Sequence, residues 1–118
     1  MFELKLKDKT IYLKWGTWAM REFCTQNNIT LEKYFEYLQD SKFDLKLLIQ
    51  MVNIGYLSAC ISLKEEIVFN DVDVCDWIDE LGSVFNPEGQ LVDYIKYIIT
   101  NTTTTISAKG PKEDKKKA

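Results

Sequence analysis

Residues 41–63 read SKFDLKLLIQMVNIGYLSACISL, with no charged side chain between Lys46 and Lys64. Apolar residues recur at the spacing of one helical face and a second apolar stripe lies beside it, which confines polar side chains to a thin strip of Lys46, Gln50 and Asn53. A helix with so little polar surface is normally covered by other elements. The stretch therefore predicts the central helix of a small helical domain.

The uncharged residues 47–63 also approach the length that crosses a bilayer. Amide and hydroxyl side chains inside the stretch would lack partners in lipid, because a single span has no neighbouring helix to bind them. We therefore predict a core helix and no membrane segment. Ser41, followed three residues later by Asp44, predicts a capping box at the N-terminus of this helix.

The composition is that of one soluble globular domain: 118 residues, 46% of them hydrophobic and 28% charged. Three cysteines, an odd number within helical patterns, favour free thiols and a reducing compartment. Met1 leads directly into the alternating sequence FELKLK, which is not the pattern of a signal peptide. The net charge is −3, and because residues 109–118 carry several lysines, the body before them is more acidic. An acidic body argues against a nucleic-acid partner.

Periodicity along the chain predicts two strands and then helices. Residues 2–7 and 10–15 alternate apolar and polar side chains around a short polar link, which is typical of a β-hairpin with one apolar face. Helical patterns follow at residues 17–28, 30–38, 41–63, 71–81 and from Asn86 and Pro87 onwards. We predict a mainly α (α+β) fold, in which an N-terminal β-hairpin is followed by about five helices packed around the central apolar helix.

Local signals set the expected boundaries. Thr17 and Thr30 are expected N-caps, and Gly82 is expected to end the helix at 71–81. Thr102 to Thr105 form a β-branched run in which the last helix is expected to fray. We therefore predict one globular domain at 1–106 and a disordered, Lys-rich tail at 107–118.

The sequence offers little for catalysis or metal binding. It has no histidine, which removes the commonest general base and most zinc sites. The cysteines form no close pair, and Asp71, Asp73 and Asp76 lack the glycine and the final glutamate of a calcium loop. We predict no catalytic residue, no cofactor and no metal. A small enzyme using carboxylates stays open as an alternative, since it would need only a concave site with perturbed Asp or Glu.

Tyrosines beside the apolar stripes suggest a surface for a partner protein, because tyrosine combines a large contact area with a polar tip. Together with the polar strip of the central helix, they predict a groove that accepts a partner helix. The candidate residues are Tyr37, Gln50, Asn53, Tyr94 and Tyr97. The alternative is that these tyrosines merely edge the core.

Five segments, in this order, resemble the tail assembly chaperones of long-tailed bacteriophages and prophages. They are KTIYL at 9–13, WGTWAMREF at 15–23, ITLE at 29–32, IGYL at 54–57 and VCDWIDELG at 74–82. The first three match the family's strand pair, Gly-Thr turn and following helices, and the last two match its central-helix glycine and its acidic helix. The resemblance covers about residues 1–100.

The resemblance implies a non-enzymatic assembly factor in the cytoplasm of the bacterial host, absent from the mature virion. It implies binding to the tape measure protein and recruitment of tail tube protein, and it leaves self-association open. The family often produces a longer, frameshifted form as a further partner, and Lys115 to Lys117 fit either a slippery codon string or a solvated tail. A head-tail completion protein that stays in the particle is the main alternative.

Overall fold

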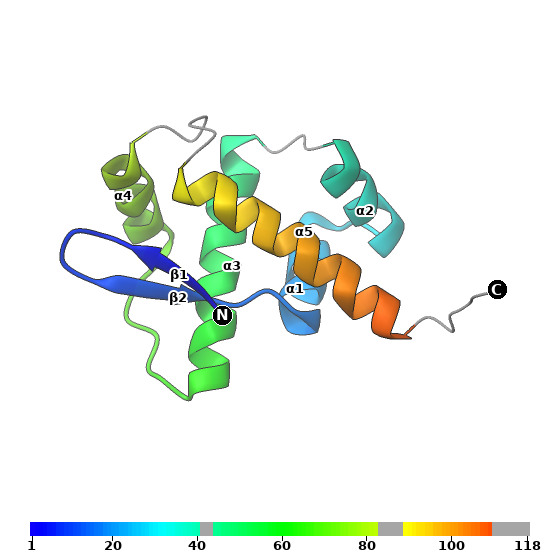
Figure 1. The fold of residues 1–118 in the computed structure, drawn as a ribbon, viewed down its shortest axis with the longest axis horizontal. Helices are drawn as coiled ribbons and strands as arrows, with labels where there is room; N and C mark the ends of the chain where they lie inside the picture. Colours follow the sequence, from blue (N-terminus) through cyan, green and yellow to red (C-terminus); the bar gives the residue numbers. More distant parts are fainter. Residues whose placement is uncertain (41–43, 83–88, 110–118) are drawn as a thin grey trace.

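The computed structural model describes residues 1–40, 44–82 and 89–109, with side chains up to Thr102. Within them the chain forms an N-terminal two-stranded hairpin and then five helices (Figure 1). This confirms the predicted mainly helical fold. The elements are β1 (Phe2–Lys5), β2 (Thr10–Leu13), α1 (Thr17–Asn27), α2 (Leu31–Asp40), α3 (Leu45–Leu63), α4 (Asp71–Leu81) and α5 (Gln90–Lys109).

The hairpin buries one of its faces, as its alternation predicts. The strands pair antiparallel, with Phe2 opposite Leu13 and Leu4 opposite Ile11. Leu4, Ile11 and Leu13 are buried, whereas the residues between them in the sequence point to solvent. A two-stranded sheet is marginal alone, so its apolar face depends on the helices against it.

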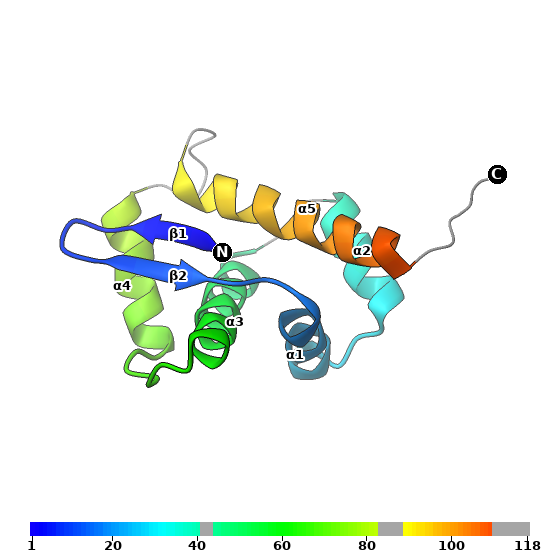
Figure 2. The same cartoon turned by 60° about the horizontal axis from the view of Figure 1, so that its bottom comes forward.

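The elements form two layers around α3. Figure 2 shows α4, α3 and α1 next to one another across the molecule, with α5 along the opposite side and the hairpin between α5 and α3. β2 packs on α3 and β1 on α5, while α1 and α4 each pack against α3. The helix α3 is therefore covered on one face by the hairpin and α5, and on its two sides by α1 and α4.

Both edges of the small sheet are tied to helices. The side-chain amide of Gln90 accepts from the backbone N–H of Lys5 at 2.7 Å and donates to the Lys5 carbonyl at 2.9 Å, as a neighbouring strand would. After the other strand, the backbone N–H of Lys14 donates to the Gly55 carbonyl of α3 at 3.0 Å. These bonds fix the hairpin in place and occupy polar groups that an edge strand would otherwise expose.

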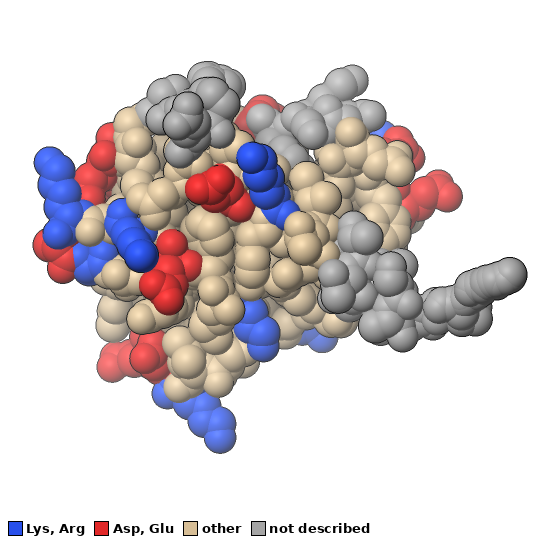
Figure 3. All heavy atoms as spheres, in the orientation of Figure 1, with Lys and Arg blue, Asp and Glu red and all other residues tan. Residues whose placement is uncertain are grey.

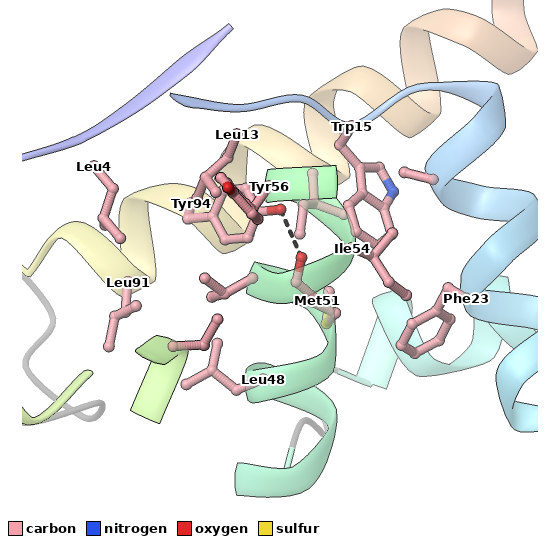
Figure 4. Packing of buried hydrophobic residues seen from close by; sticks show 14 of the residues in the cluster. Leu4, Leu13, Trp15, Phe23, Leu48, Met51, Ile54, Tyr56, Leu91 and Tyr94 are labelled. Atoms are coloured by element: carbon pink, nitrogen blue, oxygen red, sulfur yellow. Dashed lines mark hydrogen bonds between the residues drawn. The ribbon is translucent and has the colours of Figure 1, made fainter. Parts of the chain in front are cut away.

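The closest approach between the layers is at Gly55, where α5 meets α3. The phenol of Tyr94, which is fully buried, donates a hydrogen bond to the Met51 carbonyl at 2.8 Å (Figure 4). A Cβ atom at position 55 would collide with the Tyr94 hydroxyl and press on Leu13. Glycine is required here because the ring of Tyr94 and the hairpin both lie directly on the helix backbone.

Helix ends follow the expected chemistry with two differences. Asp44 caps α3 by accepting from the Leu47 N–H at 2.9 Å, so α3 begins at Leu45, and the expected cap at Ser41 lies outside the described residues. Thr30 accepts from the Lys33 N–H at 3.1 Å, as predicted. Thr17 is not the N-cap of α1, because it already lies in the helix and Gly16 takes that position.

The predicted fraying at 102–105 is wrong, since α5 continues to Lys109. Thr102 is buried and its hydroxyl lies 2.7 Å from that of Tyr34, which in turn accepts from the Trp15 indole N–H at 2.8 Å. A buried partner for the hydroxyl offsets the low helix propensity of threonine. The predicted boundary at 106/107 thus falls inside α5, and the expected start of that helix at Asn86 and Pro87 lies outside the described residues.

Among the described residues, one helix is long and apolar enough to span a membrane by composition, Leu45–Leu63, with a mean hydropathy of 1.4 over its most apolar window. Half of that window is buried within the protein. The hairpin and three helices pack around α3, which is the environment of a core helix.

We predict that Gly55→Ala destabilises the fold, although Gly to Ala in a helix interior normally gains up to about 1 kcal/mol. The new methyl must displace Tyr94 from Met51, so the free energy of unfolding should fall by about 2–4 kcal/mol, as measured by urea titration. Gly16→Ala, where an added Cβ meets nothing within 4 Å, should cost less than about 1 kcal/mol. An equal loss in both variants would contradict the close approach.

We also predict a specific alkaline response from Tyr94. Burial, reinforced by Tyr97 and Tyr34, raises the pKa of the Tyr94 phenol well above its ordinary value of 10.0. Above pH 10 the unfolded chain releases this proton while the folded chain retains it, so stability present below pH 10 is lost as pH rises toward the folded pKa.

Tyr94→Phe lacks this proton and the bond to Met51, so it should be less stable than the parent by about 1 kcal/mol at neutral pH. The difference in unfolding free energy between the parent and Tyr94→Phe should narrow above pH 10, because only the parent carries the buried phenol at position 94. Urea unfolding of both proteins from neutral pH to above pH 10 tests this expectation, with Tyr12→Phe, at an exposed position, as the control. A gap that stays constant with pH would show that Tyr94 ionises normally in the folded state.

Candidate protein-binding surface

A groove of about 550 Å³ runs along the face of α3 that the hairpin and α5 leave uncovered. Its floor belongs to the first half of α3, and its walls come from the end of α1 and the start of α4. The lining residues are Gln26, Leu45, Lys46, Ile49, Gln50, Asn53, Asp71 and Cys75. The thin polar strip of the sequence thus lies in a groove, together with apolar neighbours.

The floor is an apolar stripe with helical spacing. Leu45 is 57% exposed and Ile49 is half-buried, and one and two turns beyond Asn53 the stripe continues with the half-buried Leu57 and Ile61, which is 54% exposed. Leu45 and Ile49 are one turn apart and lie on the same side of α3, whereas Leu57 and Ile61 are rotated progressively around the helix, because a four-residue step turns by about 400°. The predicted covering of α3 by other elements is confirmed for most of the helix, whereas Leu45 and Ile61 stay exposed because the second layer covers the opposite face.

Amide side chains hold the α1 wall in place. Gln50 accepts from the Asn27 side-chain amide and donates to the Gln26 side-chain oxygen, both at 2.9 Å. Asn27 also donates to the Phe23 carbonyl of its own helix at 2.8 Å. Within the described residues the Asn53 side chain makes no hydrogen bond, so its amide is available to a partner. Gln50 therefore has a structural role, whereas Asn53 has no bond among the described residues and lies on a floor that also carries the Lys46 ammonium.

The α4 wall is acidic. Residues 65–80 contain seven carboxylates and no basic side chain, and none of the ion pairs within the described part of the chain includes any of them. Asp73 and Glu80 accept backbone N–H bonds, from Asn70 and Lys7 respectively. Asp71 and Cys75 face the groove, and Val72 beside them is 64% exposed.

The α5 and hairpin face differs in charge from the α4 wall. On it, Lys and Arg residues lie among Asp and Glu residues around uncharged side chains (Figure 3). Opposite charges so close together largely cancel at a distance. The one-sign charge of residues 65–80 is therefore a local property of α4 and the segment before it.

The structure separates the five residues predicted for partner binding. Gln50 and Asn53 line the groove together, but none of the three tyrosines does. Tyr94 is fully buried and belongs to the core, which excludes it from surface binding. Tyr97 stacks on Tyr94 with ring centroids 6.1 Å apart, and Tyr37 lies on α2 with the Lys33 ammonium 5.8 Å from its ring centroid.

Sequence reasoning missed the apolar and acidic members of the groove. The apolar spacing of residues 45–63 assigns Leu45 and Ile49 to a continuous buried face of the helix. The available signal was the spacing of Ile49, which is three residues from Lys46 and four from Leu45 and Asn53, since residues three and four apart share a helix face. The approach of Asp71 and Cys75 to α3 depends on how α4 packs, which periodicity does not reveal.

A second hollow, of about 530 Å³, lies along the outer side of α1 and the start of α2. It includes Arg21, Cys24 and Leu31. The apolar spacing of α2 places Leu31 on the buried stripe of that helix, yet the side chain is 47% exposed. Burial raises the pKa of the Cys24 thiol, which keeps it protonated and poorly nucleophilic. This hollow therefore lacks an activated nucleophile.

Neither hollow assembles a recognisable catalytic set. Among residues 1–40, 44–82 and 89–109, no three His, Cys, Asp or Glu side chains gather closely enough to hold a metal ion. In the groove, the Cys75 thiol and the Asp71 carboxylate have no histidine to act with them, because the chain contains none. The arrangement is instead suited to binding, with apolar side chains and the Lys46 ammonium on the floor, amide groups and an acidic wall.

Comparisons with protein-family models, with curated proteins and with solved structures gave no match for this chain.

Proposed function

We propose that this protein is a non-enzymatic tail assembly chaperone of a long-tailed bacteriophage or prophage. It binds the tape measure protein and helps tail tube subunits gather on it, in the cytoplasm of the host, and it leaves before the particle is complete. The resemblance across residues 1–100 supports this assignment. The open apolar face of α3 supports it independently.

The observation that carries the proposal is the floor of the groove. Leu45 and Ile49 of the most apolar helix in the chain remain accessible between two walls. Contiguous apolar surface in a concave setting is typical of a protein-binding site. Covering this face with another molecule would remove its apolar surface from water, which is favourable.

The groove suits the problem that a tape measure protein presents. A very long, apolar helical polypeptide would aggregate before the tube encloses it, and a groove on a soluble acidic domain can cover its apolar stripe. The Asn53 amide can exchange a bond to water for one to a partner at little net cost. Binding of this kind is reversible, as a factor that leaves the particle requires.

We predict that Leu45→Gln weakens binding to the tape measure protein, because it removes an exposed apolar side chain from the groove floor. Burial of one leucine is worth about 1.5–3 kcal/mol, which corresponds to roughly a 10- to 100-fold loss in affinity. Co-expression, affinity capture and titration of the purified partner would measure it.

Leu31→Gln is the matched control. Leu31 is the first residue of α2 as Leu45 is of α3, it is 47% exposed, and it lies in the other hollow. Its substitution should leave the affinity unchanged. Equal effects of both substitutions, or no capture of the tape measure protein by the parent chain, would refute the proposal.

Mass spectrometry of purified virions separates the proposal from the head-tail completion alternative. A chaperone should be absent from mature particles, whereas a completion protein should be present in fixed stoichiometry.

A further inference from the structure

We infer that the groove binds an amphipathic helix whose flank against α4 is rich in Lys and Arg. The inference rests on the proposed function, in that the groove must receive a polypeptide, and it adds the conformation and the charge of that polypeptide. Three features carry it: the helical backbone around the groove, the spacing of the apolar residues on α3 and the sign of the α4 wall.

The backbone around the groove favours a helix over an extended strand. The groove consists of side chains from α1, α3 and α4, whose backbone groups are mostly bonded within each helix. A strand adds to a protein by pairing with a free sheet edge, and no strand residue lines the groove. A helix needs no such pairing, since its own backbone bonds are internal.

The floor matches the apolar stripe of a helix. Leu45 and Ile49 lie one turn apart in the floor, and Leu57 and Ile61 continue the same four-residue ridge of this 19-residue helix beyond the groove. Ridges of this spacing interdigitate with the corresponding ridges of a second helix. Asn53, in the middle of the stripe, interrupts it with a free amide, which favours a polar residue at the matching place of the bound helix.

The α4 wall sets the charge of the partner. Asp71 lines the groove, and Asp76 and Asp79 are exposed on the same helix, within a segment that has no basic residue. Like charges on the bound helix would be repelled, and opposite charges would be attracted. The α1 wall carries amides and the floor carries Lys46, so the basic residues of the partner belong only on its flank against α4.

The same charges disfavour a second copy of this chain as the occupant. The described helices offer few cations, namely Arg21, Lys33, Lys46 and Lys96 within residues 17–102, and no helix combines an apolar stripe with a row of them. Two grooves facing each other would also bring two acidic α4 walls together. A separate, basic polypeptide therefore fits the groove better than a second copy.

Three designed peptides test the inference on the full chain. Each is an amphipathic helix of about 18 residues, roughly 27 Å long, with the same leucine stripe. They differ in one flank, which carries lysine, glutamine or glutamate. Fluorescence anisotropy at about 50 mM and about 500 mM salt then compares affinities with surface charges weakly and strongly screened.

The lysine peptide should bind at least about tenfold more tightly than the glutamate peptide at low salt, with glutamine between them, and the difference should shrink at high salt. The double substitution Asp71→Asn with Asp76→Asn should remove most of the difference in affinity between the lysine and glutamate peptides. Glu3→Gln with Asp93→Asn, exposed carboxylates on the hairpin and α5, should leave it intact. Leu45→Gln should weaken all three peptides alike.

Equal binding of the three peptides would overturn the inferred charge while leaving a groove for a helix. Failure of all three, while the tape measure protein still binds the parent and not Leu45→Gln, would overturn the inferred helix but not the proposed function. Failure of both would refute the two together. A dimer in sedimentation that Leu45→Gln converts to monomer would identify a second copy as the occupant, and would also overturn the inference.

Discussion

The contact between Tyr94 and the backbone of α3 at Gly55 decides how this protein is built. The phenol of α5 reaches the Met51 carbonyl only because position 55 has no side chain, and Leu13 of the hairpin packs at the same place. One face of α3 is thereby fixed against the hairpin and α5. The opposite face is left to α1 and α4, which lie beside α3 and do not close over it. The groove is thus a consequence of where the second layer attaches.

Much of the fold could be predicted from the sequence because its signals are local. Alternation in the first 15 residues defines the hairpin and the buried side chains Leu4, Ile11 and Leu13. Apolar periodicity defines α3, and Asp71 to Leu81 are the limits of both the predicted and the observed α4. Gly82, at a φ of 91°, ends that helix as a residue without a Cβ can.

The candidate site was less predictable because it depends on which side of each helix is covered. Periodicity marks Tyr94 as a flanking residue, yet it is completely buried because the hairpin and α3 meet it on that flank. The converse holds for Leu45 and Leu31, which belong to apolar stripes but have no element over them. Thr102 also depends on tertiary packing. Threonine is favourable at this position of α5 because Tyr34 of another helix bonds its hydroxyl.

The pairing of Gln90 with Lys5 bears on the behaviour of the chain in a crowded cell. A bare strand is a template on which other chains can stack into cross-β fibrils. Here the side-chain amide of a helix residue occupies both backbone groups of Lys5 and cannot itself be extended. This position on the edge of β1 is thereby closed to the strand pairing that seeds such a fibril.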